Sequence, residues 1–326
     1  MADIKKGFKI LKATFGVLTN KQELLDEIYF GVFYESLLTD FYKVEEIEYS
    51  DKLDFYITML DEPAGKLSLT ISENQVLLAG PVVEATKASS DLRFTIFGNE
   101  GFVFRYVMRC MEENYNIWSF HACALYDEKK NHMYIAPGGA GSGKTCLILK
   151  GLEQGLKIFS TEMTHFSFEG KGLRLYKGSL VDNIRVGNLK YSYPAVPKKL
   201  GLTLPETADE WGKKIAVDLT KEQTKFDTID DTNITVILPH IEEGRDKCIA
   251  IDVKNPKAAR KALFDNISDK IANNVLYYDV LPLGGFDTPE LMKKRVAAVD
   301  KFLTHIKRIA KVTAGSQNCW EGILNK

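Results

Sequence analysis

The stretch Gly138-Gly139-Ala140-Gly141-Ser142-Gly143-Lys144-Thr145 fits the phosphate-binding loop pattern G-x-x-x-x-G-K-[ST]. A polyphosphate requires several backbone N–H groups aimed at one point, a compact cation and a hydroxyl for the metal. Glycines let the main chain come that close, Lys144 would reach the β- and γ-phosphates, and Thr145 would offer its hydroxyl to Mg²⁺. The helix expected to begin here, with Cys146 in its first turn, would add its positive N-terminal dipole. The sequence therefore predicts a nucleotide site.

The flanks of this loop fit the same prediction. His132-Met133-Tyr134-Ile135-Ala136 has the composition of a short buried strand, and residues 145–152 have the apolar spacing of a helix. A phosphate loop needs a strand before it and a helix after it, because that geometry aims the helix N-terminus at the phosphates. Both conditions are met.

Composition limits the classes of partner. At 326 residues the chain is long enough for two domains, or for one large domain with an appendage, and 45% hydrophobic residues suffice for a substantial core. With 43 basic and 44 acidic side chains the formal net charge is −1, so we expect neither nucleic acid nor a membrane surface as a partner. The N-terminus lacks the apolar core of a signal peptide, which favours a cytoplasmic location. The five cysteines show no C-x-x-C spacing, which argues against a disulfide framework and a zinc site.

The first third of the chain reads as an α+β accessory region, residues 1–100. Residues 8 to about 40 have helical periodicity, clearest over Lys21–Phe30. Residues 54–60, 66–71 and 75–79 are β-rich runs separated by turn residues, which predicts an antiparallel meander. This region carries no motif with recognisable chemistry, and it is a candidate for acceptor specificity or for a homo-oligomer contact.

Residues 101–326 are expected to form the nucleotide domain. A helix over about 101–113 leads into a strand over 118–125, and a charged hairpin turn over 127–131 precedes the strand before the loop. Two strands joined by a hairpin directly before a phosphate loop are unusual for a doubly wound NTPase, in which a crossover helix would intervene. Further strands are expected at 156–160, 173–176, 215–219, 235–238, 247–253 and 275–280, and helices at 256–262 and 289–311.

The segment from about Trp118 to Glu162 resembles the HPr kinase/phosphorylase superfamily, whose nucleotide domain is shared with phosphoenolpyruvate carboxykinase. His121-Ala122 stands where the family has its strand-end histidine, and Gly155 falls on the family's glycine beyond the helix. Thr161-Glu162 falls on the family's Asp-Asp pair. The resemblance implies a mixed α/β fold with an HPr kinase/phosphoenolpyruvate carboxykinase-like P-loop core.

The resemblance also implies roles for individual residues. Glu162 would be the general base or a Mg²⁺ ligand, and His121 an active-site histidine. Thr161 departs from the family, because an aspartate is expected there, so only one of the two carboxylate roles is retained. Beyond Glu162 the likeness is weaker: within Asp182–Gly187 it points to Arg185, and within Gly212–Ile215 to Lys213, as phosphate or substrate contacts.

These observations predict an ATP-dependent kinase that transfers the γ-phosphoryl group to a hydroxyl of a peptide, a protein or a small molecule, with Mg²⁺ as cofactor and GTP as the alternative nucleotide. The catalytic residues would be Glu162, His121 and Lys144. One alternative is an ordinary P-loop NTPase with its second acidic residue at Asp252 or Asp279, each of which ends an apolar run. Others are a carboxykinase acting on a dicarboxylate, and a degenerate nucleotide-binding regulator without phosphotransfer.

Overall fold

The computed structural model describes residues 4–25, 40–242 and 244–324. It is a mixed α/β protein that divides into two compact units: residues 1–117 with 270–291, and residues 118–269 with 292–326. The boundary between the units follows Ile117 instead of residue 100. The reason is the helix α2 (Phe102–Tyr115), whose Tyr106 ring packs against Phe55 and Phe286, both in the first unit.

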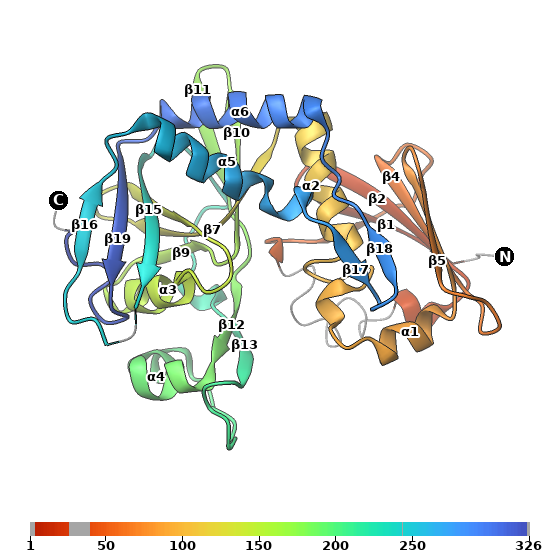
Figure 1. The fold of residues 1–326 in the computed structure, drawn as a ribbon, viewed down its shortest axis with the longest axis horizontal. Coiled ribbons are helices and arrows are strands. Elements are labelled where there is room, and N and C mark those ends of the chain that lie inside the picture. Colours follow the sequence, from red (N-terminus) through yellow and green to blue (C-terminus); the bar gives the residue numbers. More distant parts are fainter. Residues whose placement is uncertain (1–3, 26–39, 243, 325–326) are drawn as a thin grey trace. The chain divides into compact units, whose positions relative to one another are not determined.

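The first unit is built on a six-stranded sheet in the order β3-β1-β2-β4-β6-β5. Its strands are β1 (Ile4–Ile10), β2 (Ala13–Thr19), β3 (Glu45–Ile47), β4 (Phe55–Asp61), β5 (Ser68–Ser72) and β6 (Gln75–Gly80). The unit also contains α1 (Val82–Ala88) and a hairpin of β17 (Val275–Tyr277) and β18 (Leu281–Leu283) (Figure 1).

Two expectations for this unit are wrong. Residues 8–19, expected to be helical, lie in the antiparallel pair β1 and β2, because the two backbones pair in register from Ile4↔Thr19 to Ile10↔Ala13. Gln22–Leu25 form only a 3-10 turn, and the rest of the predicted helix, 26–39, lies outside the described residues. The strands 55–80 are not a simple meander, since β4 pairs with β6 in parallel and β5 is the edge strand.

The second unit contains a nine-stranded mixed sheet, ordered β14-β11-β10-β7-β8-β15-β19-β16, with β9 paired to β7. The strands nearest the loop are β7 (Trp118–Asp127), β8 (His132–Pro137), β9 (Lys157–Ser160), β10 (Met163–Glu169) and β15 (Asn233–Ile241). The others are β11 (Gly172–Tyr176), β14 (Thr228–Asp230), β16 (Ile249–Asp252) and β19 (Arg308–Ala314). The predicted hairpin of β7 and β8 is present, and β8 then runs parallel to β15.

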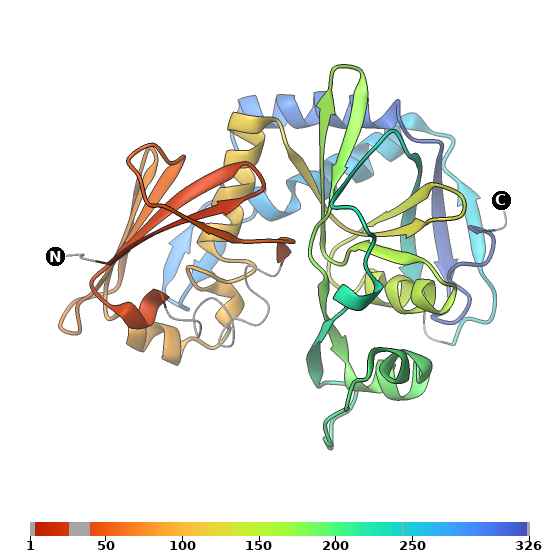
Figure 2. The same ribbon diagram turned by 180° about the vertical axis from the view of Figure 1, so that it is seen from behind.

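Helices cover both faces of this sheet (Figures 1 and 2). On one face Phe120 and Ala124 of β7 share a buried cluster with Leu263 and Ile267 of α5 (Pro256–Ala272) and with Val299 and Phe302 of α6 (Pro289–Leu303). On the other face α3 (Lys144–Glu153) packs its Gly151 against Leu125. The alternation of side chains along β7 thus fills two layers of core.

The C-terminal elements differ in extent from the prediction. The helix expected over 289–311 ends at Leu303, and residues 308–314 form β19. Alternate residues Ala310, Val312 and Ala314 are buried there, and β19 pairs in parallel with β15. α5 extends to Ala272 instead of ending near 262. The strand expected over 275–280 ends at Tyr277, because Tyr278 and Asp279 turn the chain with positive φ.

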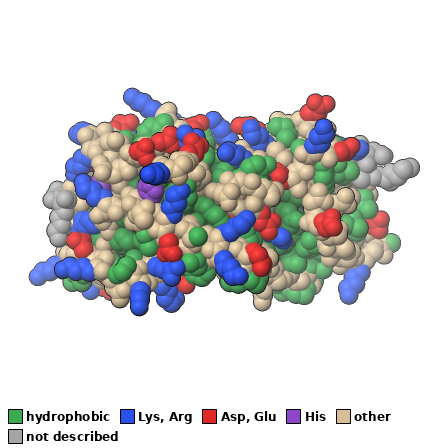
Figure 3. Space-filling view, turned by 90° about the horizontal axis from the view of Figure 1, so that it is seen from above, with side chains coloured by type: hydrophobic (Ala, Val, Ile, Leu, Met, Phe, Trp, Pro, Cys, Tyr) green, Lys and Arg blue, Asp and Glu red, His purple; other side chains and the backbone are tan. Residues whose placement is uncertain are grey.

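A small excursion follows β11. It comprises β12 (Val181–Arg185), a π-helical turn at Asn188–Ser192, α4 (Ala195–Leu200) and β13 (Lys214–Asp218), which pairs antiparallel with β12. Basic and acidic side chains are interspersed on the face drawn in Figure 3. Among the described residues, no helix combines the length and apolar character needed to span a bilayer.

Candidate active site

The phosphate loop joins the end of β8 to the start of α3, as the motif predicts. Gly141 and Gly143 have φ of +80° and +98°, a conformation that side chains other than glycine rarely adopt. A Cβ on Gly143 would also lie 2.8 Å from Cβ of Ile241 on β15, and a Cβ on Gly138 would lie 2.7 Å from Cβ of Ser142. Glycine is therefore required at both fixed positions of the motif.

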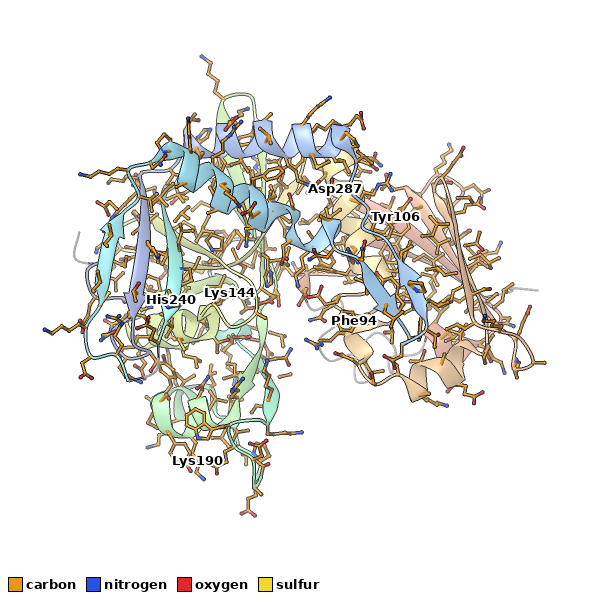
Figure 4. The ribbon with its side chains drawn as sticks, viewed as in Figure 1. Phe94, Tyr106, Lys144, Lys190, His240 and Asp287 are labelled. Carbon is orange, nitrogen blue, oxygen red and sulfur yellow. The ribbon has the colours of Figure 1, made fainter. Side chains whose placement is uncertain are left out.

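Lys144 is buried at the base of the loop (Figure 4). Its Nζ donates to the carbonyl oxygens of Gly138 at 2.7 Å and Gly139 at 3.3 Å. The same nitrogen lies 2.9 Å from Nε2 of His121 and 3.5 Å from Oε2 of Glu162. The structure thus brings together the three residues that the sequence assigns to catalysis.

His121 and Glu162 are placed by the pairing of β7 with β10. Met163 lies opposite His121 in that register, and the Ala122 N–H donates to the carbonyl oxygen of Glu162 at 2.9 Å. Nε2 of the buried His121 ring lies 2.8 Å from Oε1 of Glu162. A second carboxylate, Asp269 on α5, lies 2.9 Å from Nδ1 of the same ring. Asp269 was not among the residues expected from the sequence.

A further carboxylate, Asp182 at the start of β12, hydrogen-bonds the hydroxyl of Thr145. Burial, together with the negative charge of Glu162, raises the pKa of Asp182 to about 6. Its Oδ2 is buried and has no hydrogen-bond partner among the described residues. The sequence analysis singled out this segment for Arg185 and missed Asp182, although an aspartate beginning a strand in that segment was a usable signal.

Thr161 has a structural role at the position where the resemblance leads one to expect an aspartate. Its hydroxyl is buried and lies 2.7 Å from the carbonyl oxygen of Val181 and 3.1 Å from that of Ser179. A hydroxyl can donate to such oxygens, whereas a carboxylate only accepts and would be repelled. The local backbone therefore suits threonine.

The other residues expected from the sequence have different surroundings. Arg185 and Lys213 are exposed, and no hydrogen bond or ion pair in the described part of the chain joins either of them to the loop. Asp252 pairs with Arg308 at 2.7 Å, on the edge strand β16. Asp279 belongs to the other unit, where its carboxylate accepts from Ser90. Cys146 lies beside Thr145, and its carbonyl oxygen accepts from Tyr193 at 3.4 Å.

The residues around Thr145 fit a magnesium ion. Mg²⁺ keeps several waters and is usually held by one or two carboxylates together with substrate phosphates. Thr145, Asp182 and Glu162 provide one hydroxyl and two carboxylates, and the unpartnered Oδ2 of Asp182 is the kind of buried acceptor that a cation would satisfy. Within the described ranges no group of three or more His, Cys, Asp or Glu side chains could hold a metal ion, so the ion would depend on Thr145 and the phosphates as well as on these carboxylates.

Comparison of the chain with protein-family models and with curated proteins finds no match. The likeness to HPr kinases accordingly stays at the level of the quoted residues, and the chemistry has to be argued from the site itself.

Proposed function

We propose that this protein is a kinase that transfers the γ-phosphoryl group of ATP to a hydroxyl, either of a serine in a peptide or protein or of a small molecule. The observation that carries the proposal is the cluster at the loop: Lys144, His121 and Glu162 lie within hydrogen-bonding or ion-pairing distance of one another. An NTPase loop alone needs only the lysine and the hydroxyl for its phosphates and metal. A base and its partner beside the lysine are what an acceptor hydroxyl requires.

The roles follow from the chemistry of each group. The amides of the loop and the Lys144 ammonium would bind the phosphates, and they would neutralise charge as the bond to the leaving oxygen breaks. Glu162, with His121 beside it, would orient the acceptor hydroxyl and receive its proton. Thr145, Asp182 and Glu162 would hold Mg²⁺, which when bound supplies charge neutralisation at the phosphates.

The local topology supports an HPr kinase-like core. β7 and β8 form an antiparallel hairpin directly before the loop, His121 lies on β7, and Glu162 precedes β10. This is the order of features that the resemblance implies. The single known departure, Thr161, removes one carboxylate at that position, and Asp182 supplies another from β12.

The alternatives receive less support from the described residues. A conventional NTPase with Asp252 or Asp279 as its second acidic residue requires one of them near Thr145, yet Asp252 is held by Arg308 and Asp279 accepts from Ser90. A nucleotide-binding regulator without turnover is favoured only by Thr161.

Formation of ADP tests the proposal. Wild-type protein is incubated with Mg²⁺-ATP and a panel of serine peptides and small hydroxyl compounds, and ADP and phosphorylated acceptor are measured together. The proposal expects acceptor-dependent ADP that Glu162→Gln abolishes while nucleotide binding is retained. ADP formed at the same rate with and without every acceptor indicates an NTPase, and binding without any ADP indicates the regulator.

A further inference from the structure

The His121 side chain is only 4% exposed, and its ring has a polar partner at each nitrogen. Three charged side chains face it, each from a different part of the second unit: Lys144 from α3, Glu162 from the segment between β9 and β10, and Asp269 from α5. Lys144 and Glu162 both lie at Nε2. Asp269 lies at Nδ1, the nitrogen that points away from the phosphate-loop lysine.

α5 holds this histidine at two places. Oδ2 of Asp269 lies 2.9 Å from Nδ1, and Nδ2 of Asn266 donates to the carbonyl oxygen of His121 at 3.0 Å. Residues three apart lie on the same face of a helix, so a single face of α5 fixes both the backbone and the ring.

The chemistry of the carboxylate determines which ring nitrogen carries hydrogen. An ionised carboxylate only accepts, so Nδ1 must be the donor in its contact with Asp269. A neutral ring then has its lone pair at Nε2, where it can accept from Lys144, and any further hydrogen on the ring has to lie at Nε2, where it faces Glu162. Proton exchange by this ring is thereby confined to the nitrogen beside the reacting groups.

We propose that Asp269 is a positioning residue for phosphoryl transfer, which holds His121 in the Nδ1–H form and aims Nε2 at Glu162 and Lys144. The inference rests on the proposed kinase function and adds to it a residue that the nucleotide motif does not contain. Asp269 reaches the reacting groups through its contact with Nδ1 of the His121 ring.

Three variants on α5 test the positioning role. Asp269→Asn presents an amide N–H that can donate to Nδ1. This favours the ring form with hydrogen on Nε2, so the lone pair at Nε2 is lost. We expect kcat to fall by about 100-fold or more, with KM for ATP changed by less than about threefold. Asp269→Glu restores an acceptor, and its kcat should be at least about tenfold higher than that of Asp269→Asn. Asp265→Asn is the matched control, because Asp265 lies one turn earlier on α5 and pairs with Lys261 of the same helix.

A second readout does not depend on activity. Imidazole ¹⁵N spectra of histidine-labelled protein report which ring nitrogen carries hydrogen, and the His121 signals are assigned by their loss in His121→Asn. Wild type and Asp265→Asn should show His121 protonated at Nδ1, whereas Asp269→Asn should show a shift toward Nε2–H.

The outcomes separate the two proposals. If Asp269→Asn changes the His121 tautomer but the wild-type protein phosphorylates no acceptor, the positioning by Asp269 is supported and only the kinase function is contradicted. An active wild type whose kcat and His121 spectrum are both unchanged by Asp269→Asn overturns the positioning role and leaves the kinase function standing. Equal losses of kcat in Asp265→Asn and Asp269→Asn also overturn it, since helix charge would then explain the effect.

Discussion

Replacing Asp182 with asparagine tests whether this buried carboxylate serves a ligand or the fold. The side chain hydrogen-bonds Thr145 and lies close enough to Glu162 for the two negative charges to repel, and its Oδ2 has no hydrogen-bond partner in the part of the chain that the structure describes. Burial and that repulsion raise its pKa from 3.8 to about 6. An ionised Asp182 is therefore a cost to the folded protein whenever no cation is bound.

The size of the cost follows from the shift. The pKa rises by about 2 units, and each unit corresponds to about 1.4 kcal/mol, so the ionised form costs up to about 3 kcal/mol. Between about pH 4 and pH 6 the folded protein keeps a proton that the unfolded chain has lost, so this contribution to stability falls as the pH rises through that interval. Above the pKa of Asp182 in the folded protein the full cost is present. Asparagine does not ionise, so the Asp182→Asn protein does not carry this cost.

Urea unfolding in the absence of metal measures this difference. We expect Asp182→Asn to be more stable than wild type by about 1 to 3 kcal/mol at about pH 8, with the gain shrinking toward zero near pH 4. Asp218→Asn is the control: Asp218 lies opposite Val181 in the same two-stranded sheet, is exposed, and its asparagine can still accept from the Thr220 N–H. Equal or lower stability of Asp182→Asn at about pH 8 would refute the reasoning.

The same variant has a second, opposite effect. Mg²⁺-ATP should stabilise the wild-type protein by mass action, and most of the increment that depends on Mg²⁺ should be lost in Asp182→Asn. A variant that is more stable without ligand and less stabilised by Mg²⁺-ATP is the signature of a residue kept for binding.

Four further predictions concern single side chains. Because Glu162 would also hold Mg²⁺, Glu162→Gln should bind metal-free ATP with an affinity within about threefold of wild type in calorimetry. With Mg²⁺ it should lose about 100-fold or more in kcat for ADP formation, and an unchanged kcat would exclude Glu162 as the base. Gly143→Ala should weaken ATP binding at least about tenfold, because Gly143 has a φ of +98° and the added Cβ would collide with Ile241 on β15. Gly139→Ala is the control, since its added Cβ meets open space, and equal affinities of the two variants would contradict the loop geometry. Thr161→Asp should lower the urea-unfolding free energy by about 3 kcal/mol or more, since the carboxylate would face carbonyl oxygens, and a gain of activity without this loss would be contrary to expectation. Burial lowers the pKa of His165 to about 3, so below about pH 6.5 the unfolded chain takes up a proton that the folded protein excludes, and up to about 5 kcal/mol of unfolding free energy is lost as the pH falls toward 3. In His165→Gln the unfolding free energy from urea titrations should therefore fall less steeply at acid pH, and the same steepness as in wild type would reject this assignment.

The strand–loop–helix conformation around Gly138–Thr145 was predictable because its determinants are local. Glycines at fixed positions, the following lysine and the flanking strand and helix lie within one short segment, so the sequence alone places them. His121 and Glu162 were predictable for a related reason: the register of β7 with β10 brings their segments together, and the resemblance encodes their spacing from the loop.

Asp182 and Asp269 could not be assigned in the same way. Asp269 lies on a helix far along the chain, and its place at Nδ1 of His121 depends on how α5 packs on the sheet. The same dependence on tertiary packing explains the wrong predictions of secondary structure. Residues 8–19 have apolar spacing that suits either a helix or a strand, and the strand forms because β1 pairs with β2 and β2 pairs with the distant β4. Pairing of this kind is a property of the tertiary structure.

The arrangement of the carboxylates also bears on the choice between a kinase and a silent regulator. Thr161 alone favours the regulator, because a site with one acidic residue fewer has lost part of its means to hold metal and base. Asp182 weakens that argument, since it returns a second carboxylate to the vicinity of Glu162 from a different strand. This carboxylate costs the folded protein stability, and strongly perturbed carboxyl groups concentrate at functional sites. Under the proposed function, a second, costly acidic group beside Thr145 would hold the Mg²⁺ that neutralises charge during phosphoryl transfer, and this weighs toward the proposed kinase over a silent regulator.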